Sequence, residues 1–248
     1  MLRAVLVNKD ATFKNYFKTT RTMIGEKVII GEDFKRLAQE LSERLIPLIQ
    51  EHPGRFVLSI SGESGSGKTS ISFALANQLT EEGIKAVVIQ QDDYSALPPQ
   101  QTVLKRRKSL VRVGFSEVQL ALLEKNLQEI KEGKEEIEKP LVVLDKNQIV
   151  REVVSLKEVK VVIVEGIYSF ILDNVDKYLF INRQFWETAE ARKLRGRDEQ
   201  DELMERVLQI EHGLVLLGKP KADFFITKNF EILENPKKKK RTRGDFQN

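Results

Sequence analysis

The sequence predicts an α/β fold, a parallel β-sheet flanked by helices, and two observations lead to this prediction. Short apolar runs alternate with helical patterns from Arg55 onward, as expected when strands are connected by helices that pack on the sheet. A glycine-rich segment, residues 62–67, lies between the first of these strands and a helix, where open α/β sheets bind ligands. The predicted strands are residues 56–61, 85–90, 159–164, 178–181 and 223–226.

The residues that precede this region, 1–54, are predicted to form a small N-terminal appendage packed on the main domain. Residues 2–7 and 27–30 have the apolar pattern of short strands. A helix is predicted to begin after Gly31, where two acidic residues favour a helix N-terminus, and to end at residues 52–54, His-Pro-Gly. We identify no catalytic residue in this appendage.

The main domain, residues 55–234, contains two further predicted features between its strands. Residues 116–131 have the apolar spacing of an amphipathic helix, which Gly133 would end. Residues 141–144 and 148–154 are separated by a short polar turn, a pattern that predicts a β-hairpin laid over the sheet.

Composition limits the class of protein. The 248-residue chain has no cysteine, which excludes disulfides and thiolate metal sites, and 41% of its residues are hydrophobic and 31% charged. No apolar run approaches the ~20 residues of a membrane span. Lys9 and Asp10 interrupt the start of the chain before a secretory signal can form. We therefore expect a cytoplasmic protein with no membrane partner.

The positive charge is concentrated at the end of the chain. Residues 235–248 carry six Lys or Arg residues against one acid, Asp245, whereas the whole chain has a formal net charge of +4. The rest of the chain is thus close to neutral and gives no sign of a nucleic-acid surface. We predict that residues 235–248 form a basic, disordered tail, with weak, salt-sensitive attraction to RNA as its possible interaction and nuclear localisation as a less favoured alternative.

The strongest motif is residues 62–69, GESGSGKT, which satisfies the P-loop pattern G-x-x-x-x-G-K-S/T between a strand and a helix. Backbone N–H groups of such a loop cradle phosphates, Lys68 would reach the β and γ phosphates, and the Thr69 hydroxyl would bind Mg²⁺. The fold expected is therefore a P-loop NTPase-type sheet; a glycine-rich turn that matches by chance is the alternative. The candidate nucleotide-binding residues are Gly62, Glu63, Ser64, Gly65, Ser66, Gly67, Lys68, Thr69, Ser70 and, farther along the chain, Arg192.

A pair of acids directly follows the second predicted strand, in the segment Gln91-Asp92-Asp93-Tyr94. Their carboxylates should emerge at the ligand-binding edge of the sheet. In phosphoryl transfer, a carboxylate near the attacking hydroxyl orients it and accepts its proton. We assign this catalytic role to Asp92 and a metal or substrate contact to Asp93. The two roles could be exchanged, and a pair of solvated loop acids is the alternative.

Residues 161–164 form an apolar run that ends in Glu165 and Gly166, as in a Walker-B strand. Glu165 is therefore predicted beside the P-loop, where it would hold the Mg²⁺ shell through water or orient the acceptor hydroxyl. A residue that only caps its strand is the alternative. The predicted metal-binding residues are Thr69, Asp92 and Glu165.

Basic residues gather in the helical pattern that follows Asn182, namely Arg183, Arg192, Lys193, Arg195 and Arg197. Guanidinium groups that arrive when a lid closes neutralise charge that develops in the transition state. A solvated helix face with charge pairs at helical spacing is the alternative.

The order of these motifs resembles that of the uridine kinase and phosphoribulokinase family of P-loop kinases, over roughly residues 55–228. Besides the P-loop, the matching features are a Q-D stretch at Gln91, E-G-I at Glu165, R-G-R-D at Arg195 and A-D-x-x-I at Ala222. The resemblance implies that Asp92 is the general base and that residues 195–198 belong to a lid over the phosphates. It implies ATP and Mg²⁺ as cofactors and a small-molecule hydroxyl acceptor as partner.

The acceptor is less well defined than the reaction. Asp93, Tyr94, Arg151 and Tyr168 are the candidate acceptor-binding residues. The tyrosine and the histidine that handle uridine in the resembled family have no counterpart after Pro140, which shifts the expectation toward a sugar, sugar phosphate, hydroxy acid or vitamin. For His212, in a predicted helix near the end of the chain, a structural role is more common than a functional one.

These observations predict an ATP- and Mg²⁺-dependent kinase of a small metabolite, with Asp92, Lys68, Glu165, Arg195 and Arg197 as its catalytic residues. A homo-oligomer is possible. The alternatives are a nucleotide-dependent switch or nucleic-acid-associated NTPase, in which residues 105–108, Lys-Arg-Arg-Lys, contact RNA, and a catalytically silent P-loop scaffold.

Overall fold

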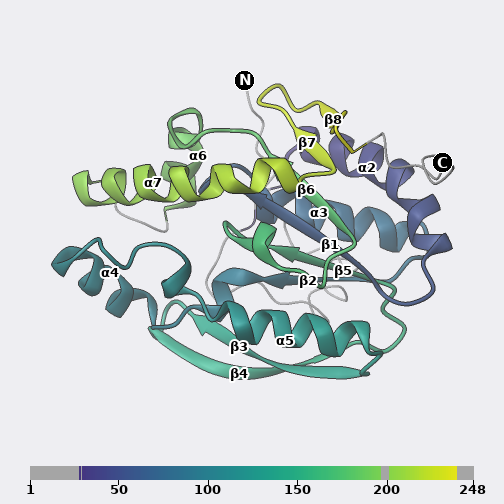
Figure 1. The fold of residues 1–248 in the computed structure, drawn as a ribbon, viewed down its shortest axis with the longest axis horizontal. Helices are drawn as coiled ribbons and strands as arrows, with labels where there is room; N and C mark the ends of the chain where they lie inside the picture. Colours follow the sequence, from purple (N-terminus) through teal and green to yellow (C-terminus); the bar gives the residue numbers. More distant parts are fainter. Residues whose placement is uncertain (1–27, 29, 197–200, 239–248) are drawn as a thin grey trace, which may run out of the picture.

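The fold is built on a six-stranded sheet with the strand order β2-β5-β1-β6-β7-β8 (Figure 1). The computed structural model describes residues 28, 30–196 and 201–238. The strands of this sheet are β1 (Phe56–Gly62), β2 (Ala86–Gln90), β5 (Val161–Glu165), β6 (Lys177–Ile181), β7 (Phe224–Ile226) and β8 (Ile232–Glu234). All neighbouring strands are parallel except β7 and β8, which are antiparallel. The predicted α/β fold is confirmed, with β8 as an additional edge strand.

Helices lie on both faces of the sheet (Figure 1). The α-helices are α2 (Glu32–Glu51), α3 (Lys68–Glu81), α4 (Pro99–Lys108), α5 (Leu120–Lys131), α6 (Ala189–Arg195) and α7 (Glu202–Val215). Short 3₁₀ turns are η1 (Gln91–Tyr94), η2 (Phe115–Glu117), η3 (Ser169–Ile171), η4 (Phe185–Thr188) and η5 (Leu216–Lys221). The helix predicted from residue 116 begins at Leu120 instead, because η2 occupies the preceding residues.

The central strands β1, β2 and β5 each contribute to two hydrophobic cores, because successive side chains point to opposite faces. Leu58 of β1 and Ile163 of β5 lie in one core with buried side chains of α2 and α3. Val57 and Val162, one residue earlier on the same strands, lie in the core of the other face with buried side chains of α5. The strands are covered on both faces, which explains their continuous apolar runs.

The helix predicted after Gly31 is confirmed as α2, which packs on α3 at one face of the sheet. Its buried side chains Leu37, Leu41 and Leu45 follow one another at intervals of four residues and lie in the same core as those of α3. Val28 and Ile30, in the second predicted strand, are not in a strand. The first predicted strand, residues 2–7, lies outside the described residues.

The predicted hairpin is confirmed as a separate two-stranded antiparallel sheet, formed by β3 (Glu136–Val143) and β4 (Gln148–Ser155). Ile137 and Val154 are buried in the core that also contains the apolar face of α5. Figure 1 shows the hairpin along the outer side of α5. Its strands are longer than predicted, since β3 also includes charged residues that the apolar pattern does not detect.

The start of the predicted tail packs on the domain. Asn235 is buried and donates a hydrogen bond of 2.8 Å to the backbone oxygen of Ala222. Residues 239–248, which carry most of the predicted tail, lie outside the described residues. Within the described part of the chain, no helix combines the length and the apolarity needed to cross a bilayer.

Candidate active site

The loop between β1 and α3 passes close to side chains from two other helices. The backbone is left-handed at Gly65 and Gly67, with φ of +74° and +104°. A Cβ atom at Gly65 would lie 2.7 Å from Cγ of Arg192 on α6, and one at Gly67 would lie 2.4 Å from Cζ of Phe34 on α2. Glycine is therefore required at both positions by conformation and by space, and α3 begins directly after Gly67.

Polar contacts fix the path of this loop. Glu63 is buried, and its Oε1 lies 2.9 Å from Nδ1 of His212 on α7. Its Oε2 accepts a hydrogen bond of 2.8 Å from the backbone N–H of Phe185. The backbone oxygen of Ser64 accepts a hydrogen bond of 2.9 Å from the Thr188 hydroxyl. Segments about 120 to 150 residues farther along the chain thus hold the loop in place.

Two side chains of the loop fit a bound anion. The Ser66 hydroxyl is buried and has no hydrogen-bond partner among the described residues, an arrangement that is costly unless a ligand atom completes it. Lys68 begins α3 and donates a hydrogen bond of 3.0 Å to the Glu63 backbone oxygen. Burial lowers the pKa of Lys68, against the opposing effect of the nearby Glu165 and Asp92 carboxylates. The residues present therefore fit a phosphate group at the loop.

Glu165 lies at the carboxyl edge of the sheet, between β1 and β2. It ends β5, with Ile60 of β1 and Gln90 of β2 opposite it in the two neighbouring strands. Its Oε1 accepts hydrogen bonds of 3.0 Å from the Thr69 hydroxyl and 3.1 Å from the Gln90 side-chain amide. Within the described residues, no three His, Cys, Asp or Glu side chains are grouped to hold a metal. Mg²⁺ commonly takes only one or two protein oxygens besides phosphate and water, and Thr69 with Glu165 suits that role.

A cavity of about 790 Å³ lies at this edge of the sheet. Lys68, Asp92 and Arg195 all line it. Asp92 and Arg195 are close enough to Lys68 to change its pKa, which Asp92 raises and Arg195 lowers. The Asp92 side chain is half-buried, whereas that of the adjacent Asp93 is fully buried. The structure thus brings four predicted catalytic residues, Lys68, Asp92, Glu165 and Arg195, to one place.

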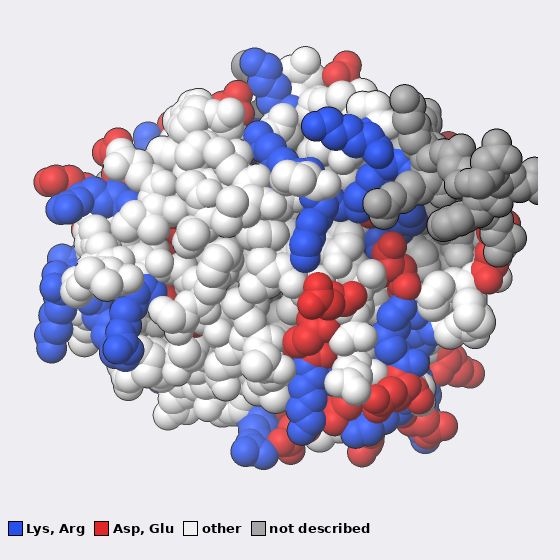
Figure 2. All heavy atoms as spheres, viewed as in Figure 1, with Lys and Arg blue, Asp and Glu red and all other residues white. Residues whose placement is uncertain are grey.

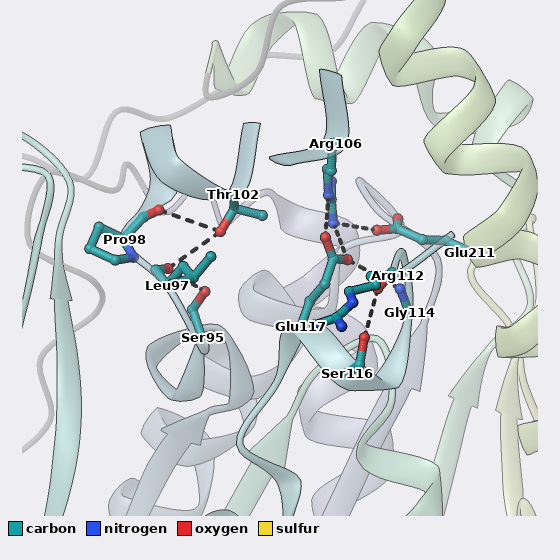
Figure 3. A network of polar contacts seen from close by, with 10 residues as sticks. All are labelled: Ser95, Leu97, Pro98, Thr102, Arg106, Arg112, Gly114, Ser116, Glu117 and Glu211. Atoms are coloured by element: carbon teal, nitrogen blue, oxygen red, sulfur yellow. Dashed lines mark hydrogen bonds and ion pairs between the residues drawn. The ribbon is translucent and has the colours of Figure 1, made fainter. Parts of the chain in front are cut away.

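An ion-pair cluster that the sequence did not predict also lines the cavity (Figure 3). Arg106 of α4 binds both carboxylate oxygens of Glu117, with Nε to Oε1 at 2.8 Å and Nη2 to Oε2 at 2.9 Å. Its Nη2 also lies 3.1 Å from Oε1 of Glu211 on α7. Burial raises the pKa of Glu211 to about 7, with the Arg106 charge as the opposing effect. The contact between Arg106 and Glu211 thus joins α4 to α7 at the cavity.

Asp93, Tyr94 and Arg151 do not lie at the cavity, so their predicted contact with the acceptor is corrected. Asp93 is fully buried, with Oδ2 2.6 Å from Nζ of Lys139 and Oδ1 accepting a 3.1 Å hydrogen bond from the Val142 N–H. The Tyr94 side chain is buried, and its hydroxyl donates a hydrogen bond of 2.8 Å to Oδ1 of Asn126 on α5. Arg151 is exposed on β4 and pairs with a carboxylate of β3. Successive side chains of a 3₁₀ turn point about 120° apart, so Asp92 reaches the cavity while Asp93 points into the interior.

The remaining predicted residues divide in the same way. Tyr168 lines the cavity, as predicted. Arg192 is buried and donates hydrogen bonds of 2.5 Å to the Phe185 backbone oxygen and 2.9 Å to the Thr188 hydroxyl. It therefore stabilises η4 and does not line the cavity. Arg197 lies outside the described residues.

Residues 57–182 match a family model described as the phosphoribulokinase / uridine kinase family. The match covers just over half of the chain. This chain belongs to the phosphoribulokinase / uridine kinase family. The prediction from the motif order is confirmed, and the family agrees with the predicted class of a phosphotransferase with an alcohol acceptor.

Relatives of this family member are described as kinases. The chain is 30% identical over 130 residues to a uridine kinase of Leuconostoc citreum, a match that covers 51% of this chain and 61% of the relative. It is 25% identical over 194 residues to a bifunctional alpha-galactosidase/sucrose kinase of Mediterraneibacter gnavus, covering 73% of this chain and 21% of the relative. The matches thus span less than two thirds of the length of either relative.

Solved structures share the fold. A putative fructose transport system kinase from Silicibacter superposes with a TM-score of 0.57 at 22% identity, over 76% of this chain and 95% of the other. A D-glycerate 3-kinase from Cryptococcus neoformans superposes with a TM-score of 0.56 at 14% identity, over 82% and 98%. At these identities the likeness shows the fold alone.

Little in the sequence indicates the cluster around Arg106. The only role predicted for residues 105–108 is an RNA contact, and helix α4 has neither a buried residue nor an apolar stripe that would point to the interior. The one local signal is Gly114 followed by Glu117 at the spacing of a capping box, and Glu117 does accept a hydrogen bond of 3.1 Å from the Gly114 N–H. The contact with Glu211, 105 residues farther along, could not be inferred from spacing.

His212 contacts the phosphate loop through Glu63, which suits the structural role expected for it. We expect His212→Ala to weaken ATP binding about tenfold or more, because hydrogen bonds to charged groups contribute ~1.5–3 kcal/mol and Glu63 is buried. Isothermal titration with ATP measures the effect, and His212→Gln, which keeps a donor, should recover part of it. His52→Ala is the matched control, because His52 pairs with Asp176 and does not contact the loop. An unchanged affinity in His212→Ala would contradict this role.

Proposed function

We propose that this chain is an ATP- and Mg²⁺-dependent kinase that transfers the γ-phosphoryl group of ATP to a hydroxyl of a small metabolite. The observation that carries the proposal is the convergence of Lys68, Asp92, Glu165 and Arg195 at the carboxyl edge of the sheet, beside a loop that fits a phosphate. A protein that only bound nucleotide would have no use for a half-buried carboxylate such as Asp92 facing this cavity.

The phosphate side of the site consists of the loop, Lys68 and Arg195. Bound ATP would supply the γ-phosphoryl group, and Mg²⁺ would offset its negative charge. Backbone N–H groups of residues 63–69 and the N-terminus of α3 favour the phosphates, and Ser66 offers its hydroxyl. Lys68 and Arg195 stabilise the charge on the phosphoryl oxygens as the bond to the leaving ADP breaks. Thr69 and Glu165 would hold the metal, with Glu165 acting directly or through water.

Asp92 is the general base in this proposal. Its carboxylate accepts the proton of the acceptor hydroxyl while the hydroxyl oxygen forms the new bond to phosphorus. Asp92 lies in η1, directly after β2, and lines the same cavity as Lys68. The attacking oxygen and the phosphate would therefore be held together. The lid segment with Arg195 would exclude water, which otherwise competes with the acceptor.

The nucleic-acid alternative has less support. Arg106, in the basic run of α4, is engaged with two carboxylates inside the cavity. Figure 2 shows a face that is largely uncharged, with Lys and Arg side chains in separate groups rather than in one continuous basic surface. Polynucleotide binding usually needs such a surface.

ADP release tests the proposal. The protein is mixed with ATP and Mg²⁺, and ADP is measured in a coupled assay with nucleosides, sugars, sugar phosphates, hydroxy acids or poly-RNA. We expect strong stimulation by a small alcohol and slow hydrolysis without one. Chelation of Mg²⁺ should abolish turnover. Stimulation by RNA alone, or tight ATP binding with no stimulation by any acceptor, would contradict the proposal.

A further inference from the structure

Paired charges line the part of the cavity formed by α4, η2 and α7, here called the acceptor side. Arg106 is held by Glu117 and Glu211, and Arg107 lies 3.6 Å from an oxygen of Asp201. The acidic residues of this side are Glu117, Asp201 and Glu211, against Arg106 and Arg107, and the cavity is also lined by Asp92 and Asp145. An anionic acceptor would meet this excess of carboxylates and would have to compete with them for the guanidinium groups.

One hydroxyl at this side is buried and unsatisfied. Tyr168 is 2% exposed, lines the cavity, and its hydroxyl has no hydrogen-bond partner among the described residues. Burial raises the pKa of Tyr168, the nearby Glu211, Glu117 and Asp92 carboxylates raise it further, and the Arg106 charge opposes them. The hydroxyl therefore stays protonated, as a donor and acceptor without a protein partner. Leaving such a buried group unpaired is unfavourable, and a ligand hydroxyl would remove that penalty.

The same side is apolar between its charged groups and offers no stacking surface. Among the described lining residues, Tyr168 is the only aromatic one, and its ring packs edge-on against Phe115 with centroids 4.8 Å apart. The apolar lining residues include Val118, Val142 and Ile167. Aliphatic side chains suit the C–H faces of a sugar, whereas a nucleobase would be expected to stack on an exposed aromatic ring.

We propose that Tyr168, Glu211 and Arg106 form a subsite for the hydroxyl groups of a neutral polyhydroxylated acceptor, a sugar rather than a sugar phosphate, a hydroxy acid or a nucleoside. Neighbouring hydroxyls of such an acceptor donate to the Glu211 carboxylate and pair with the Tyr168 hydroxyl, and the Arg106 guanidinium orients Glu211. The inference rests on the proposed kinase function and names its substrate class. Asp92 lines the same cavity and lies close enough to both Lys68 and Glu211 for their charges to interact.

Paired acceptors test the substrate class. ADP release is measured with D-fructose, D-glucose and sucrose as neutral sugars, and with fructose 6-phosphate, D-glycerate and uridine as the competing classes. We expect kcat/KM for at least one neutral sugar to exceed that for every competing acceptor by tenfold or more. Preference for an anionic acceptor or for uridine would overturn the subsite while leaving the kinase function intact. Absence of stimulation by all six acceptors would overturn the kinase function and the subsite with it.

Tyr168→Phe tests the residue, because it removes only the hydroxyl. We expect the KM for the preferred sugar to rise about tenfold while the KM for ATP changes less than twofold. Tyr178→Phe is the matched control, because it also removes a tyrosine hydroxyl. Tyr178 lies on β6, and its hydroxyl donates a hydrogen bond of 2.7 Å to the Leu172 backbone oxygen. This variant should leave both KM values unchanged. Thermal unfolding of both variants identifies any loss of folding. A sugar KM that is unchanged in a folded Tyr168→Phe would overturn the subsite.

Discussion

Replacing Asp92 by asparagine is expected to lower kcat about 10²-fold or more, because the acceptor hydroxyl loses its general base. Asparagine has nearly the same shape and cannot accept the proton. The KM for ATP should change little, since Lys68 and the loop remain in place. Steady-state ADP release with saturating acceptor measures the change, and circular dichroism verifies that the variant is folded.

The neighbouring carboxylate gives the matched comparison. Asp93→Asn changes the adjacent residue in the same way, but Asp93 is buried away from the cavity. We expect folded Asp93→Asn to keep most of its kcat. If Asp92→Asn retained activity while folded Asp93→Asn lost it, the two roles assigned from the sequence would have to be exchanged.

Removing the Asp93 carboxylate is expected to cost ~3–5 kcal/mol of the free energy of unfolding, because Asp93→Ala leaves a buried ammonium without its nearest partner. Lys139 and Asp93 have side chains that are 3% and 1% exposed, and they join β3 to η1. Glu152, 3.2 Å from Lys139 and 19% exposed, compensates only in part. Urea denaturation measures the loss.

A double variant separates the pair from the rest of the core. Asp93→Ala with Lys139→Met removes both charges, so it should recover a large part of the stability lost by Asp93→Ala alone. If the double variant were as unstable as the single one, the unpaired ammonium would not be the cause.

The pH dependence of this stability follows from Asp93. Burial raises its pKa from 3.8 to about 6, although Lys139 opposes the shift. The native state therefore binds this proton more tightly than the unfolded state, and the contribution of Asp93 to the free energy of unfolding falls as pH rises through that interval. Asp93→Asn should flatten the profile there, and urea denaturation across this range tests it.

Much of the catalytic side of the site was predictable from the sequence, because local motifs specify it. The loop needs glycines at fixed positions, Lys68 and Thr69 follow them at the start of a helix, and Glu165 ends an apolar strand. Parallel strands bring their carboxyl ends to one edge, so these residues meet once the strand order is correct. The α/β fold, the hairpin and α2 follow from the same apolar periodicity.

The direction of each side chain in an irregular segment was not predictable. Asp92 and Asp93 are adjacent acids in one 3₁₀ turn, and nothing local distinguishes the one that lines the cavity from the one that binds Lys139. Arg151 stands on the outer strand of the hairpin, where its pairing partner is a surface acid rather than a ligand.

The sequence by itself determined the reaction side of this protein, namely its family, its phosphate loop and the acids at the strand ends, because short-range backbone geometry specifies them. On the acceptor side the sequence indicated Tyr168, and only the tertiary structure decided what surrounds it. Arg106, Glu117, Tyr168 and Glu211 come from four separate segments and are brought together by the packing of α4, η2 and α7 around the cavity. Such long-range contacts depend on the whole fold, and no spacing along the chain encodes them.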